Sequence, residues 1–215
     1  MDSPLDLNMV GDIRQAILLT NVHDLKNRQY KGIKVIDWFR AQEKAGRLTI
    51  VSQNVSWRSP PAIAQLADLA IDATLGFPAT ESRAMTPIGH AGIFTVAVAD
   101  AERYAAEHNA LCLRSRADTG ACCQLPYVNI GNAKGLEAAH VLIWPTEPML
   151  QFLRRGKPLR PQSASALYVA VTRARASVAF ITDADIGLPV WAPPAASLRH
   201  PVEAVAETDL HTQAA

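Results

Sequence analysis

The sequence predicts an α/β protein with a parallel sheet and helices on both of its faces, and two patterns support this fold class. Short apolar runs rich in Val and Ile alternate along the chain with helix-like stretches, as strands alternate with the helices that cover them. The runs are continuous rather than alternating, which is typical of strands buried on both faces. With 215 residues, of which 49% are hydrophobic and 19% charged, the chain has globular composition and can bury a core.

Six apolar runs are candidate strands, and four stretches with helical spacing lie between or beside them. The predicted strands are residues 48–52, 92–98, 110–114, 127–130, 140–144 and 177–182. The predicted helices are residues 60–75, 99–108, 146–155 and 163–173. The first of these helices begins with prolines, which suit a first turn, and places Ile63, Leu66 and Ala67 on one face.

The two ends of the chain differ from this central pattern. Residues 6–10 look like a strand that runs into Gly11, and residues 21–34 are polar and predict a loop. The cations of that loop are Lys26, Arg28, Lys31 and Lys34. They fit either a solvated loop or a contact with phosphate or with a partner. Residues 189–215 are rich in Pro and Ala and predict a mobile tail.

Charge, hydropathy and cysteine content exclude several classes of function. Lys and Arg number 21 against 20 Asp and Glu, a formal net charge of +1, so any nucleic-acid surface must be local. No apolar run approaches the roughly 18 residues of a membrane span, and the acidic start lacks the pattern of a signal peptide. We therefore expect a cytoplasmic protein without membrane contact. Cys112, Cys122 and Cys123 have no His or Cys at ligand spacing, so we predict reduced thiols and no metal site.

Four short segments carry the residues best suited to chemistry. In chain order they are Val10-Gly11-Asp12-Ile13-Arg14-Gln15, Asn54-Val55-Ser56-Trp57-Arg58-Ser59, Asn132-Ala133-Lys134-Gly135-Leu136-Glu137 and Leu167-Tyr168-Val169-Ala170-Val171-Thr172-Arg173-Ala174. Their order and content resemble the C-terminal half of UvrD/Rep-like superfamily 1 helicases, over roughly residues 9–181. The resemblance implies a RecA-like lobe at residues 46–188, preceded at residues 1–45 by a remnant of the first motor lobe and the crossover between lobes.

The resemblance also implies catalytic roles for three residues. Arg173 and Arg58 correspond to the two arginines that meet the γ-phosphate of ATP, and Gln15 corresponds to the glutamine that senses it. Such an arginine is worth on the order of 10³–10⁵ in rate in phosphoryl-transfer enzymes. Without the resemblance, both arginines also fit surface ion pairs. We expect Arg58 and Arg173 to face one cleft at an edge of the sheet, beside residues 134–137.

Four further residues are implied to bind the nucleotide. Trp57 corresponds to the aromatic side chain that stacks on adenine, although a core position is the plain alternative. Glu137 corresponds to a carboxylate near the sugar. Lys134 and Gly135 are predicted to lie at a strand-to-helix turn, where backbone N–H groups and a cation favour a phosphate. Asp12 is expected to shape the turn that follows its strand.

The chain lacks the G-x-x-x-x-G-K-[ST] loop and the Asp-Glu pair that ATP hydrolysis requires. The leading hypothesis is therefore the C-terminal motor lobe of a UvrD-like DNA helicase. It would hydrolyse ATP only with a complementing N-terminal half, either separately encoded or part of a longer parent protein, that also supplies the Mg²⁺ site. Single-stranded or partly duplex DNA is the implied partner, although the residues themselves fit DNA or RNA. The alternative is a non-catalytic RecA-like module that docks to a nuclease or ATPase partner.

Overall fold

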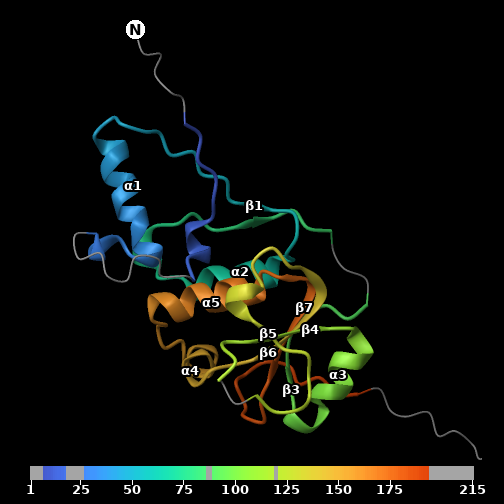
Figure 1. The fold of residues 1–215 in the computed structure, drawn as a ribbon. Coiled ribbons are helices and arrows are strands. Elements are labelled where there is room, and N and C mark those ends of the chain that lie inside the picture. The colour runs from blue at the N-terminus through green and yellow to red at the C-terminus, as the bar shows by residue number, and fades with distance from the viewer. Residues whose placement is uncertain (1–6, 18–26, 86–88, 119–120, 194–215) are drawn as a thin grey trace, which may run out of the picture.

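The computed structural model describes residues 7–17, 27–85, 89–118 and 121–193, and it has the predicted parallel α/β architecture (Figure 1). Five strands pair in the order β3-β7-β6-β4-β5, and every pairing is parallel. The strands are β3 (Gly92–Val96), β4 (Leu111–Arg114), β5 (Val128–Asn129), β6 (Ala138–Trp144) and β7 (Ala174–Ile181). The predicted fold class is confirmed, and the sheet is consistent with a RecA-like lobe.

Helices cover both faces of this sheet. Figure 1 shows α2 (Pro61–Ala70) and α5 (Pro161–Val171) on one face and α3 (Ala101–His108) on the other. Successive residues of β6 point to opposite faces: Val141 packs in the core with α2, α5 and α4 (Glu147–Arg155), whereas Leu142 packs in the core with α3. Because both faces are buried, the strand sequences read as continuous apolar runs.

The amino-terminal part forms a helix and short turns outside the main sheet. Helix α1 (Val35–Lys44) was not predicted, because its polar sequence buries only Ile36. A second, two-stranded parallel sheet joins β1 (Val55–Ser56) to β2 (Glu81–Ser82). The 3₁₀ turns of the described residues are η1 (Ile13–Gln15), η2 (Arg28–Tyr30), η3 (Gly32–Lys34), η4 (Ala73–Leu75), η5 (Val98–Asp100) and η6 (Ile130–Asn132).

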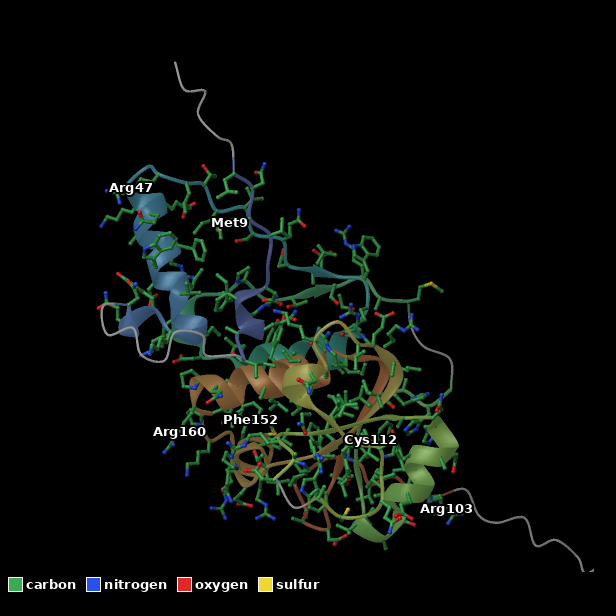
Figure 2. All side chains as sticks on the ribbon, in the orientation of Figure 1. Met9, Arg47, Arg103, Cys112, Phe152 and Arg160 are labelled. Atoms are coloured by element: carbon green, nitrogen blue, oxygen red, sulfur yellow. The ribbon has the colours of Figure 1, made fainter. Side chains whose placement is uncertain are left out.

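Two predicted strands are wrong. Residues 48–52 have no strand pairing, and the backbone N–H of Ile50 instead donates to Glu43 Oε1 at 2.8 Å. Of the strand predicted at 6–10, the described residues 7–10 are irregular and exposed. Figure 2 shows Met9 on the far side of α2 and α5 from the five-stranded sheet. No described strand lies beside either run, so neither can form a ladder of hydrogen bonds.

The chain covers the outer edge of β3 with residues that follow β7. The backbone N–H of Thr95 donates to Pro189 O at 2.8 Å, and that of Trp191 donates to Thr95 O at 2.8 Å. Trp191 is only 8% exposed. The first residues of the predicted tail thus pack on the sheet, and residues 194–215 lie outside the described part of the chain.

A cluster of imidazole and aromatic side chains fills the space between α3 and the sheet. His90 Nε2 lies 2.9 Å from the Tyr104 hydroxyl, which lies 3.2 Å from Ser177 Oγ. The rings of His90 and His108 stack with centroids 4.2 Å apart, and His140 Nδ1 lies 2.8 Å from Ser177 Oγ. Burial, and then the charges of His108 and His140, lower the pKa of His90 to about 4.

We expect acid to weaken the fold through His90. As the pH falls from 6.5 towards 4, the unfolded chain takes up a proton on this residue that the folded chain refuses, so the free energy of unfolding falls. His90→Phe keeps a ring for stacking on Phe94 and removes the titration. Urea unfolding at pH 7 and at pH 5 should show a smaller loss in the variant than in the original protein. If both proteins lost the same free energy of unfolding between pH 7 and pH 5, the assignment of this loss to His90 would be contradicted.

Candidate functional site

The four motif segments converge on one open cleft of about 570 Å³, at the edge of the sheet where β6 and β7 begin. The lining residues from these segments include Asp12, Gln15, Trp57, Arg58, Glu137 and Arg173. Arg58 and Arg173 therefore face the same cleft. It lies at the amino ends of two parallel strands, and not at the carboxyl ends where ligands of open α/β sheets usually bind.

Glu137 holds two arginines at the mouth of the cleft. Its Oε2 accepts from Arg58 Nε at 2.9 Å, and its Oε1 lies 3.4 Å from Arg175 Nη1. The Arg58 guanidinium also donates from Nη1 to Thr172 O at 3.4 Å. The side chains of Arg58, Glu137 and Arg175 are 40%, 41% and 58% exposed. Water competes for these ion pairs, so they are available for exchange with another anion.

Arg173, by contrast, is built into the wall of the cleft. It is 3% exposed, and each nitrogen of its guanidinium has an acceptor in the chain. Nε donates to Val169 O at 3.1 Å, Nη1 to Leu136 O at 3.2 Å and Nη2 to Thr172 Oγ1 at 3.2 Å. Burial, and then the nearby charge of Arg58, lower the pKa of Arg173 below its usual range. This arginine joins the end of α5 to the turn before β6.

Asp12 is the centre of a polar network on the opposite wall. It accepts from Arg14 Nε at 3.0 Å, from Gln15 Nε2 at 3.1 Å and from the Tyr168 hydroxyl at 3.0 Å. Its Oδ1 also accepts from the backbone N–H of Arg14 at 3.1 Å and so caps η1, which confirms its predicted role in shaping a turn. Burial raises the pKa of Asp12, but the hydrogen bond and charge of Arg14 outweigh it, and the pKa lies below 3.8.

The network ties η1 to two helices. Arg14 Nη1 lies 3.2 Å from Asp68 Oδ1 on α2 and donates to Thr80 Oγ1 at 3.1 Å. Its guanidinium carbon lies 4.8 Å from the centre of the Tyr168 ring on α5. Burial, and then the charge of Asp12, raise the pKa of Tyr168, so its hydroxyl stays protonated and donates. Gln15 is thereby held against α5 through Asp12.

Trp57 stands at the rim of the cleft and is 72% exposed. This exposure excludes the core position that was its alternative. The guanidinium of Arg83 lies over its ring, with the guanidinium carbon 5.8 Å from the ring centre. One face or edge of the indole is therefore open to a planar ligand.

Lys134 and Gly135 do not line the cleft. The predicted strand-to-helix turn is wrong, because the residues follow the 3₁₀ turn η6 and precede a strand, β6. Both residues are exposed, and Gly135 has a φ of 93°, a left-handed conformation that favours glycine. No helix begins at this turn, so the dipole argument for a phosphate there does not hold.

The structure brings four further residues to the site that sequence reasoning did not select. Arg14, Tyr168 and Arg175 lie within or directly after the motif segments, so their signal was present in the quoted residues. Asp68, on the helix predicted at 60–75, was given no role from the sequence. Its role as a partner of Arg14 depends on a contact between residues 54 positions apart, which no local pattern shows.

Comparisons with known proteins give little beyond this geometry. No protein-family model matches the chain, and no curated protein matches it in sequence. Among solved structures, the chain is similar to the PRRSV helicase at 15% sequence identity and a TM-score of 0.38. The match covers 63% of this chain and 24% of that one, so the chain spans about a quarter of that helicase.

The described residues hold neither a membrane span nor a metal cluster. No helix among them is both long and apolar enough to cross a bilayer. No group of three or more His, Cys, Asp and Glu side chains in the same residues is arranged to hold a metal ion. Cys112, Cys122 and Cys123 are free thiols.

The arrangement suits a polyanion. Two exposed arginines, Arg58 and Arg175, pair with Glu137. The lining of the cleft as a whole holds more arginines than carboxylates, because Arg14 and Arg173 also line it and Asp12 is the other carboxylate. Guanidinium groups bind phosphate through paired, charge-assisted hydrogen bonds. The exposed arginines thus offer donors to a phosphate group, and Trp57 at the rim offers an aromatic surface to a planar group.

Proposed function

We propose that this chain is the second motor lobe of a UvrD-like DNA helicase, which supplies arginines to an ATP site completed by another lobe. The observation that carries the proposal is the meeting of four separated motif segments in one cleft with an excess of arginine. Arg58 is proposed to stabilise the γ-phosphate, Gln15 to sense it, and Trp57 to stack on adenine. Arg173 is proposed to join Arg58 at the γ-phosphate, which requires its guanidinium to exchange one of its hydrogen bonds within the chain for a phosphate oxygen. Glu137 remains the candidate contact of the sugar.

The proposed partners follow from the resemblance of the motifs. Single-stranded or partly duplex DNA is the proposed track, and a phosphate-binding loop with its Mg²⁺ ligands would come from an N-terminal helicase half. A docking module for a nuclease or ATPase is the second candidate, and the missing phosphate-binding loop favours it. The two candidates differ in whether the cleft binds ATP.

We predict that the purified chain binds ATP weakly and does not hydrolyse it. Binding should quench the fluorescence of Trp57 because the base stacks on its indole, while turnover should be absent because no loop positions the phosphates. The measurement is a fluorescence titration with ATP and a phosphate-release assay with single-stranded DNA. Trp57→Phe should lose the quenching, and Trp38→Phe, which removes an exposed indole on α1, should keep it.

Two outcomes would contradict this proposal. A rate of about 1 s⁻¹ or more that Arg173→Ala abolishes would show a complete ATPase in this chain. Absence of any quenching at millimolar ATP would leave the docking module as the better account.

A further inference from the structure

Of the two arginines that the motifs single out, Arg58 is exposed to a ligand and Arg173 is not. The guanidinium of Arg173 is saturated by Val169 O, Leu136 O and Thr172 Oγ1 and is 3% exposed. Arg175 lies two residues later, at the start of β7, and its side chain is 58% exposed on the lining of the cleft. A phosphate that enters from solvent would therefore meet Arg58 and Arg175 first.

Glu137 already joins these two arginines. One carboxylate oxygen lies 2.9 Å from Arg58 Nε and the other lies 3.4 Å from Arg175 Nη1. A phosphate group presents the same kind of oxygen acceptors with more charge, and arginine binds both anions through the same fork of N–H donors. The carboxylate thus occupies the place in which a phosphate would bind both arginines.

We propose that Arg175 is a further phosphate-contacting residue of this cleft, and that Glu137 is an internal anion that polyphosphate displaces. The inference rests on the proposed function only in taking phosphate as the ligand. It gives Glu137 a role in the empty cleft that differs from contact with a sugar. Exchange is feasible because all three side chains are between 40% and 58% exposed, so the ion pairs are weak.

The test uses inorganic tripolyphosphate, which has neither base nor sugar, and isothermal titration at low salt. Arg175→Gln should weaken binding about fivefold, because one charge-assisted contact to an exposed group is lost. Glu137→Gln should strengthen binding about fivefold, because the competing anion is gone. Arg155→Gln, at an exposed arginine of α4 outside the cleft, is the matched control and should leave the affinity unchanged. Thermal unfolding of each variant checks that the fold is retained.

Each result that differs from these expectations overturns a stated part of the proposal. Unchanged affinity in Arg175→Gln would remove this residue from the site. Weaker binding in Glu137→Gln would show that the carboxylate holds the arginines in place and does not compete. Failure of both the original protein and Glu137→Gln to bind would overturn the whole inference. Tripolyphosphate binding without quenching of Trp57 by ATP would support this inference and contradict the proposed function.

Discussion

Replacing Asp12 with Ala should lower the free energy of unfolding by about 2–3 kcal/mol, because it leaves a largely buried arginine without its main acceptor. Five donors lose their partner together: Arg14 N, Nε and Nη2, Gln15 Nε2 and the Tyr168 hydroxyl. The side chains of Asp12 and Arg14 are 28% and 13% exposed, and this partial solvation keeps the loss at the lower end of the range for buried pairs. Urea unfolding at pH 7 measures it.

Asp72→Ala is the matched control for Asp12→Ala. Asp72 also caps a 3₁₀ turn, with Thr74 N donating to its Oδ1 at 2.9 Å, but it is exposed and has no charged partner in that contact. Its loss should lower the free energy of unfolding clearly less than the loss of Asp12, because water competes for an exposed cap. Equal losses in the two variants would mean that the network around Asp12 adds nothing to the cap.

The contribution of Asp12 to the free energy of unfolding should also depend on pH. Its pKa in the folded chain lies below 3.8, so the stability it supplies is present above the pKa of the unfolded carboxyl and is lost as the pH falls through the folded value. Asp12→Ala should therefore differ from the original protein by less at pH 3 than at pH 7.

The second large effect is expected at Arg173. Arg173→Ala should cost about 2–3 kcal/mol of stability, because it removes the donors to Val169 O and Leu136 O and leaves a void where the aliphatic part of the side chain packs. Arg175→Ala, two residues away, should change stability by less than about 0.5 kcal/mol, because an exposed ion pair adds little. Thermal or urea unfolding compares the two.

Loss of activity in Arg173→Ala could come from the missing guanidinium or from a weakened fold, and the stability of the two variants helps to separate these causes. If Arg173→Ala is destabilised as predicted, its loss of activity would not report on catalysis. The ATP-dependent activity of a reconstituted motor should then be measured with Arg173→Lys, which keeps a charge and part of the packing. An Arg173→Ala protein as stable as the original would show that the hydrogen bonds to α5 and to Leu136 contribute little.

The sequence predicted the main sheet well because strands that are buried on both faces appear in it as continuous apolar runs. The runs at 92–98, 110–114, 140–144 and 177–182 each overlap a strand of the five-stranded sheet, since residues covered on both faces are mostly apolar. The run at 48–52 has the same composition and forms no strand. Whether an apolar run becomes a strand depends on a neighbour with free N–H and C=O groups, and composition carries no information on neighbours.

The candidate site could likewise be predicted only in part from the sequence. The motif segments selected Arg58, Arg173, Gln15 and Glu137, and all four line one cleft. The pattern did not show that Arg173 is buried or that Arg175 is open, since exposure depends on which carbonyls lie within reach. Tyr168 and Asp12 are 156 positions apart and meet only through the packing of η1 on α5.

The order of strands has a consequence for the time at which the protein can fold. Strand β7 lies between β3 and β6 in the sheet, yet it is the last of the five to leave the ribosome. Until β7 is synthesised, β3 has no neighbour and the two halves of the sheet stay apart, so folding waits for long-range pairing and should be slow. The cleft is completed by residues immediately before β7, which makes it one of the last regions of a nascent chain to form.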